Sequence, residues 1–240
     1  MSEPTINWSA YARHYDLLCS HNDSYSELLD ALSSFLSSAD LPENPLIVDV
    51  GAGTGNFSAI ISETLPDSNI YHIDANREMN LRALSKYELH DHRNITIIES
   101  DVLEAKLDSN SVDLIICINC LYAMNPQALV LEKFRSWLKP SGLLYVVDLG
   151  REMKPLDWGL HFFRRAQKKH YVFEYLKDAI RGREVVKQNR TTRIAQLSGE
   201  YWMHDTIEFG NILTQSGYNL LKLEPCYRDY ADLAICQFAQ

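Results

Sequence analysis

Residues 48–57 read Val48-Asp49-Val50-Gly51-Ala52-Gly53-Thr54-Gly55-Asn56-Phe57, an apolar run that leads into three closely spaced glycines. Because glycine has no Cβ atom, the backbone can turn tightly here and a ligand can lie directly against it. A helix that starts near Asn56 would point its free N-terminal amides toward the same place. The stretch therefore predicts a strand, a ligand-binding turn and a helix, in that order.

Short apolar runs alternate with longer amphipathic stretches along the first 150 residues. Continuous runs of Ile, Val and Leu are typical of strands that are buried on both faces of a parallel sheet. The runs are Leu46–Val50, Asn69–Ile73, Ile95–Glu99, Val112–Ile118 and Leu143–Leu149. Helices are predicted between them at Phe57–Thr64, Arg77–His90 and Pro126–Leu138, the last ending at the stop signal Lys139-Pro140-Ser141-Gly142. This order predicts a doubly wound α/β sheet with right-handed crossovers.

Both ends of the chain add further elements. An amphipathic helix is predicted at Tyr25–Ser38, and another helix at Asp205–Ser216 is closed by Gly217. Two strand-like runs follow at Leu220–Glu224 and Leu233–Phe238, joined by residues 225–232.

Between these parts, residues 151–204 break the strand–helix rhythm. This insert carries twelve Lys and Arg residues against six Asp and Glu, in a chain whose net charge is −9. It is also rich in aromatic side chains. One interpretation is a cap that shapes a substrate pocket and favours an anionic or a planar acceptor. The other is a solvated helical excursion whose aromatic residues pack on the edge of the sheet.

Composition limits the classes of function. The 240 residues are 46% hydrophobic and 23% charged, which is typical of one globular domain. The acidic balance argues against a general partner among nucleic acids or anionic membranes. We predict no transmembrane helix and no signal peptide. The five cysteines are too scattered for a disulfide scaffold, so we predict a reducing, cytoplasmic location. Cys117 and Cys120 form a CxxC motif, but there is no second pair and no nearby His, so we predict structural cysteines and no metal.

Two acidic residues follow the second and third predicted strands. Asp74 lies nineteen residues after Gly55, where a carboxylate can accept hydrogen bonds from both hydroxyls of an adenosine ribose. Asp101 follows the next strand and is suitably placed for an adenine amino group. Either acid alone would more commonly be a surface or helix-capping residue. Together with the glycine-rich turn after the first strand, the two acids make three features at successive strand ends, and this combination favours a bound adenosine.

This constellation resembles the class I S-adenosylmethionine-dependent methyltransferases, closely from Leu46 to about Leu149 and more loosely at the terminal strands. The resemblance implies a mostly parallel seven-stranded sheet with helices on both faces, the last strand antiparallel, and a helical, aromatic insert after strand five. It implies S-adenosylmethionine as cofactor and S-adenosylhomocysteine as product. The implied cofactor contacts are Tyr15, Asp49, Gly51, Gly53, Gly55, Asp74, Ala75, Asp101, Val102 and Asn119.

The resemblance also suggests an organisation within a single domain of residues 1–240. Residues 1–40 form an N-terminal cap over the cofactor, residues 41–150 the cofactor-binding core, residues 151–204 a substrate cap, and residues 205–240 a terminal helix and strand hairpin. The opening Tyr11-Ala12-Arg13-His14-Tyr15-Asp16 is similar to an element that folds over the cofactor in many members that act on small molecules.

Departures from the motifs of nucleobase methyltransferases narrow the range of possible acceptors. After strand four the chain reads Asn119-Cys120-Leu121-Tyr122 and not the Asn/Asp-Pro-Pro-Tyr of enzymes that methylate exocyclic amines of nucleobases. Pro225-Cys226 is similar to the catalytic dipeptide of cytosine-C5 methyltransferases, but it follows the wrong strand, so we interpret Cys226 as structural. We therefore expect a small-molecule acceptor, no nucleic acid and no membrane partner, in a monomer or homodimer.

Three alternatives remain open. A dinucleotide-dependent oxidoreductase also uses glycines and an acid, but its fingerprint is G-x-G-x-x-G, whereas Gly51, Gly53 and Gly55 give G-x-G-x-G. A regulatory or assembly subunit could bind the cofactor without transferring a methyl group. A protein methyltransferase could receive a peptide under the same cap.

Methyl transfer from a sulfonium is an in-line displacement, in which the protein aligns the acceptor, excludes water and, where needed, removes a proton. Candidate bases are His14, His161 and His204, each set against the alternative of a packing or surface histidine. We name His14 and His161 as catalytic candidates. The candidate substrate contacts are Tyr11, Tyr122, Trp158, Phe162 and His204.

Overall fold

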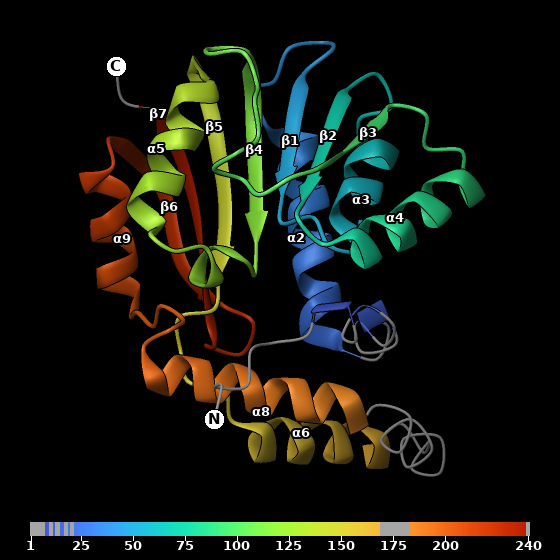
Figure 1. The fold of residues 1–240 in the computed structure, drawn as a ribbon, viewed down its shortest axis with the longest axis vertical. Helices are drawn as coiled ribbons and strands as arrows, with labels where there is room; N and C mark the ends of the chain where they lie inside the picture. The colour runs from blue at the N-terminus through green and yellow to red at the C-terminus, as the bar shows by residue number, and fades with distance from the viewer. Residues whose placement is uncertain are drawn as a thin grey trace.

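The computed structural model describes residues 8–9, 12, 15–16, 19, 22–168 and 183–238. Seven strands form one sheet in the order β3-β2-β1-β4-β5-β7-β6 (Figure 1). The strands are β1 (Leu46–Val50), β2 (Asn69–Asp74), β3 (Ile95–Glu99), β4 (Val112–Ile118), β5 (Leu138–Asp148), β6 (Tyr218–Cys226) and β7 (Ala231–Phe238). The predicted seven-stranded, doubly wound fold is confirmed.

Strand directions follow the expected pattern. Strands β1 to β5 pair in parallel, and β7 pairs antiparallel with both β5 and β6. All seven residues of β4 are buried, which explains why this strand reads as a continuous apolar run without alternation. The sheet order reverses between β1 and β4, where crossovers leave to opposite sides and a crevice opens at the carboxyl ends of the strands.

Helices cover both faces of the sheet. On one face lie α2 (Asp23–Ser38), α3 (Asn56–Thr64) and α4 (Arg77–Leu89), whose buried side chains include Leu32, Ile61 and Tyr87. On the other lie α5 (Gln127–Trp137) and α9 (Thr206–Gln215), which bury Phe134 and Phe209 against the sheet. A single 3-10 turn, η1 (Leu121–Ala123), follows β4. These helices agree with the predicted ones to within two residues at each end.

Two element boundaries differ from the predicted ones. Strand β5 begins at Leu138, five residues before the predicted run, because Val112 pairs with Leu138 and Leu114 then pairs with Leu143. Residues 139–142, which we predicted as a stop signal, therefore lie within β5, at an irregularity in its pairing with β4. The β6–β7 connection is also shorter than predicted, because Pro225 pairs with Asp232 and the hairpin turns within residues 227–230.

The described residues of the basic insert include the helices α6 (Pro155–Lys168) and α8 (Arg183–Ser198). Figure 1 shows them side by side beneath the carboxyl ends of the strands. Trp158 of α6 packs on Tyr227 and Tyr230 of the β6–β7 hairpin, with ring centroids 5.2 and 5.3 Å apart. Some insert aromatics are therefore packed against the sheet end, as one of the two interpretations required. In the described part of the chain, no helix is long and apolar enough to cross a membrane.

Candidate active site

The glycine-rich turn after β1 has a left-handed backbone. Gly53 has φ +58°, and the atom nearest to a Cβ built there is 3.9 Å away, so the position is strained for other residues and open to a ligand. Gly55, with φ +79°, caps α3, and a Cβ there would collide with the Tyr87 hydroxyl. Gly51 and Gly53 line the cavity described below, whereas Gly55 is buried against Tyr87 beneath it.

Asp74 holds this turn in place. Its carboxylate accepts hydrogen bonds from the amides of Gly53 (2.8 Å) and Asn76 (2.8 Å), one on each oxygen. Burial raises the pKa of Asp74, and the two amide bonds partly oppose that shift. The side chain lines the cavity, so its free lone pairs are available to ribose hydroxyls. Sequence reasoning predicted the ribose contact but missed this second role, which depends on pairing between β1 and β2.

Asp49 lies beneath the turn. It is 2% exposed, accepts a hydrogen bond from the Ser58 hydroxyl at 2.6 Å, and does not line the cavity. Burial raises its pKa to about 7, because the carboxylate is removed from water and the acid Asp74 is nearby. Its predicted contact with the cofactor remains a prediction.

The third and fourth strands supply the next part of the wall. Asp101 is exposed, accepts from the amide of Leu103 at 2.8 Å, and lines the cavity together with Val102 and Ala75. After β4, Asn119 has φ +55° and its side-chain oxygen is buried without a hydrogen-bond partner in the described structure. An unpaired oxygen at a cavity wall is available to a ligand N–H donor.

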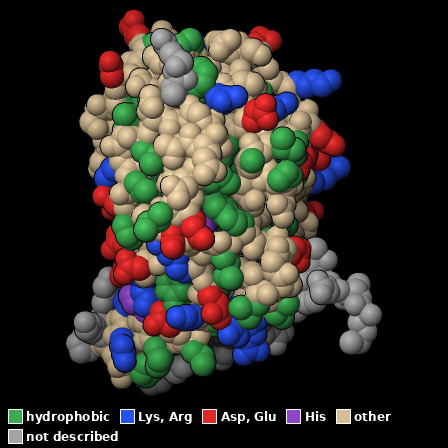
Figure 2. All heavy atoms as spheres, turned by 90° about the vertical axis from the view of Figure 1, so that its left-hand side faces the viewer, with side chains coloured by type: hydrophobic (Ala, Val, Ile, Leu, Met, Phe, Trp, Pro, Cys, Tyr) green, Lys and Arg blue, Asp and Glu red, His purple; other side chains and the backbone are tan. Residues whose placement is uncertain are grey.

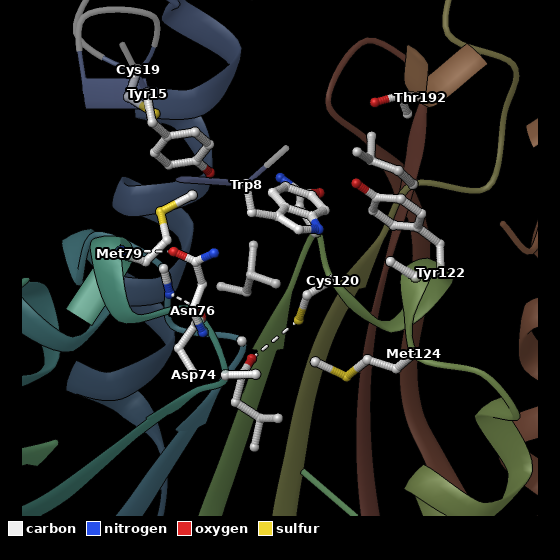
Figure 3. A pocket seen from close by; sticks show the side chains of 18 of the residues that line it. Trp8, Tyr15, Cys19, Asp74, Asn76, Met79, Cys120, Tyr122, Met124 and Thr192 are labelled. Carbon is white, nitrogen blue, oxygen red and sulfur yellow. Dashed lines mark hydrogen bonds between the residues drawn. The ribbon is translucent and has the colours of Figure 1, made fainter. Parts of the chain in front are cut away.

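The CxxC pair ties two strand ends together at the same place. Cys120 Sγ lies 3.2 Å from Cys117 Sγ and donates to the Val50 carbonyl at 3.1 Å, which joins the end of β4 to the end of β1 (Figure 3). Both are free cysteines. Among the described residues, no group of three or more His, Cys, Asp or Glu side chains is arranged to hold a metal ion.

A cavity of about 330 Å³ lies at the carboxyl ends of the parallel strands, where the sheet order reverses. Figure 3 shows Asp74, Asn76 and Met79 on one side, Tyr122, Met124 and Thr192 on the other, and Trp8 between them. Of the predicted site residues, the cavity is lined by Tyr15, Gly51, Gly53, Asp74, Ala75, Asp101, Val102, Asn119, Tyr122, Trp158 and Phe162. Sequence reasoning did not name several residues that also line it: Trp8, Cys19, Met124, Met153, Thr192 and Tyr227.

Part of the N-terminal segment lies over the glycine-rich turn. Asp16 accepts hydrogen bonds from Thr54 Oγ1 (2.7 Å) and Asn56 Nδ2 (3.2 Å) and pairs with Lys86 Nζ at 3.4 Å. This cluster joins three segments that are distant in the sequence, and no sequence signal marked it. His14 and Tyr11, the predicted base and substrate contact, lie outside the described residues.

The other two candidate histidines do not line the cavity. His161 stands on α6 next to Trp158, where burial and the nearby Arg228 lower its pKa. His204 is buried, with Nε2 3.3 Å from Asp148 and Nδ1 3.6 Å from Asp232. Its position ties the ends of β5 and β7 together, and no signal in the sequence paired it with these acids.

Residues 47–142 match the family model described as a methyltransferase domain. Together with the fold and the glycine turn, Asp74 and Asp101, this match defines a domain of the class I methyltransferases, whose cofactor is S-adenosylmethionine. Residues 47–142 of the chain therefore form an S-adenosylmethionine-dependent methyltransferase domain, as the sequence predicted.

Two curated relatives and one solved structure illustrate what the chain is similar to. Release factor glutamine methyltransferase of Fusobacterium nucleatum is 30% identical over 137 residues, which cover 57% of this chain and 35% of that protein. Phosphoethanolamine N-methyltransferase of Plasmodium falciparum is 24% identical over 160 residues, covering 66% of this chain and 59% of that one. A chain in the solved complex that contains the Haloferax volcanii Trm112 methyltransferase activator has a TM-score of 0.68 at 14% identity and covers 99% of this chain and 100% of its own length. The last likeness shows the fold alone.

Proposed function

We propose that the protein transfers the methyl group of S-adenosylmethionine to an oxygen or nitrogen atom of a small-molecule acceptor. The observation that carries this proposal is one continuous cavity with two chemically different ends. Polar residues at the ends of β1, β2 and β3 form one end, and aromatic residues of the cap form the other. The polar end suits the adenosine part of the cofactor, and the aromatic end suits an acceptor placed beside the methyl group.

The adenosine end follows from the described contacts. The Asp74 carboxylate can accept from ribose hydroxyls while it keeps the Gly53 amide in place. Asp101 and the buried Val102 lie at the next strand end, where they can contact the adenine ring. S-adenosylmethionine supplies an activated methyl group when bound, and the chain's own residues hold and orient it.

The acceptor end lies under the insert. Trp158 and Phe162 of α6, together with Thr192 of α8, line the cavity beside the hairpin residue Tyr227. Trp8, Tyr15 and the cap residues line the space between the two ends, where they can limit the access of water and so favour methyl transfer to the acceptor over transfer to water. A concave site of this size favours a small molecule over a folded protein.

Proton removal has no evident base in the described walls of the acceptor end. Burial raises the pKa of Cys19 to about 12, and burial also raises the pKa of Tyr25 well above its usual value. An acceptor nitrogen that arrives in its neutral form needs no base before attack. His14 remains the predicted base for an acceptor that does need one.

Calorimetric titration with S-adenosylhomocysteine, and separately with NADH, tests the proposal. We expect S-adenosylhomocysteine to bind and NADH not to bind. Asp74→Asn should weaken binding roughly tenfold to a hundredfold, because it removes charge-assisted bonds to the ribose and to Gly53. The exposed acid Asp108 offers a matched control, and Asp108→Asn should bind normally.

Transfer itself is tested by release of S-adenosylhomocysteine from S-adenosylmethionine in the presence of a small-molecule acceptor panel. Turnover with a small molecule supports the proposal. Binding of NADH alone overturns it in favour of an oxidoreductase. Cofactor binding with transfer only to protein substrates supports the protein methyltransferase alternative.

A further inference from the structure

This inference rests on the proposed function and names the class of acceptor. We propose that the acceptor is a planar aromatic molecule without an anionic group, and that it carries an oxygen or nitrogen atom that accepts the indole N–H of Trp158.

The sheet order separates the two ends of the cavity. Asp74 and Asp101 stand at the ends of β2 and β3, on one flank of β1. Trp158 and Tyr227 stand beyond β5, on α6 and in the β6–β7 hairpin. With β1 and β4 between them, a cofactor that contacts both acids leaves the second end free for the acceptor.

Rigid aromatic rings form that second end. Trp158 is 5% exposed and packs on Tyr227 (5.2 Å between ring centroids) and on Phe162 (5.6 Å). Tyr122, from η1, is 4% exposed and is held edge-on by Tyr201 at 5.1 Å. These rings cannot move apart without losing packing, so they favour a flat guest with a large π surface.

Trp158 also presents an unsatisfied donor. Its Nε1 atom is buried and has no hydrogen-bond partner in the described structure. A buried N–H without a partner costs free energy, and a buried indole usually finds one. Since Trp158 lines the cavity, a carbonyl, hydroxyl or ring nitrogen of a bound acceptor can supply the missing partner.

Two cations beside the cap aromatics already pair with acidic residues. Arg165 pairs with Asp23, and Arg228 pairs with Asp157 at 2.9 Å while it stacks over the Trp158 ring at 4.6 Å. No Lys or Arg is found among the described residues that line the cavity. An anion held there would be desolvated, and it would have to share Arg228 with Asp157, which makes its burial costly.

This conclusion separates the protein from relatives that bind phosphorylated substrates. Phosphoethanolamine, the substrate in the name of the Plasmodium falciparum relative, carries a dianionic phosphate that normally requires Arg or Lys partners. The described walls of the acceptor end offer aromatic rings, the Thr192 side chain and the indole N–H of Trp158, and no Lys or Arg. The basic charge of the insert is therefore not directed into the site by any described lining residue.

Three probes test the class of acceptor by calorimetry on the protein saturated with S-adenosylhomocysteine. The first two, 2-naphthol and 2-naphthoate, share one ring system and differ in charge, and the third is phosphoethanolamine. We expect 2-naphthol to bind at least tenfold more tightly than 2-naphthoate, and phosphoethanolamine not to bind. Tighter binding of either anion overturns the inference.

Trp158→Phe tests the N–H donor, because it keeps an aromatic ring and removes Nε1. We expect about tenfold weaker binding of 2-naphthol with unchanged affinity for S-adenosylhomocysteine. Trp202→Phe is the matched control, since Trp202 stacks on His204 at 4.2 Å and does not line the cavity. Unchanged naphthol binding in Trp158→Phe overturns the role of Trp158. Failure of S-adenosylhomocysteine to bind the wild-type protein overturns the proposed function itself, so the two failures are distinct.

Discussion

Replacing Asp49 by Asn is expected to make the stability of the protein less dependent on pH. Burial raises the pKa of this carboxyl from 3.8 to about 7 in the folded protein. Ionisation of Asp49 is therefore easier in the unfolded chain than in the native state. The stability that the protonated carboxyl supports is fully present below about pH 4 and is lost as the pH rises through about 7.

The expected magnitude follows from these two pKa values. Between pH 5 and pH 8 the linkage relation gives a loss of about 2 to 3 kcal/mol from Asp49 alone. Asn cannot ionise. Between pH 5 and pH 8 the free energy of unfolding of Asp49→Asn should therefore fall by about 2 to 3 kcal/mol less than that of the wild type. The new amide leaves one N–H near Ser58 without a partner, which lowers stability by a similar amount at every pH and does not alter the slope.

Urea denaturation at several pH values between 5 and 8, followed by circular dichroism, measures the difference between the two slopes. Asp108→Asn serves as a control, because Asp108 is exposed. Other buried acids, such as Asp148, affect the wild type and the variant equally and cancel in the comparison. Parallel curves for wild type and Asp49→Asn would refute the reasoning.

Further substitutions test the turn, the N-terminal contact and the buried ion pair. Gly55→Ala should lower the free energy of unfolding by about 2 to 4 kcal/mol, because the backbone is left-handed there and the new Cβ would collide with Tyr87. Gly159→Ala is the control: its Cβ meets open space in α6, so thermal denaturation should show a neutral or slightly stabilising effect. Asp16→Ala should weaken S-adenosylhomocysteine binding about tenfold in calorimetry while the melting temperature changes little, and an unchanged affinity would contradict a role for this contact. Arg151→Met should destabilise by about 3 to 5 kcal/mol in urea denaturation, because the fully buried Asp232 loses its cation, and a loss below about 1 kcal/mol would show that Asp232 is satisfied without it.

The cofactor end of the site was predictable because it is local in the sequence. Each predicted residue there directly follows a strand, and parallel strands bring their carboxyl ends to one edge. Strand order and glycine spacing alone were therefore enough to group Asp74, Asp101 and Gly53. Asp49 shows the limit of this reasoning. It also lies at the end of a strand, next to Val50, but the tertiary structure places its carboxylate beneath the turn, where Ser58 donates a hydrogen bond to it.

The acceptor end could not be predicted in the same way. Trp158 was named for its chemistry, but its partners Tyr227 and Tyr230 lie far along the chain, in a hairpin turn for which residue patterns predicted only a connection. His204 was named as a substrate contact, and its position between Asp148 and Asp232 depends on three separate segments. A pattern of residue types does not say which face of a helix is buried against which loop.

The fold and the strand-end residues proposed to bind adenosine could be read from the sequence, because apolar periodicity and glycine spacing act over a few residues. The proposed acceptor end depends on the tertiary structure. There the cap helix α6, the hairpin and the N-terminal residues converge from opposite ends of the chain. Two ion pairs are equally non-local: Arg165 pairs with Asp23, and Arg228 pairs with Asp157. From composition alone, both cations were available to bind an anionic acceptor.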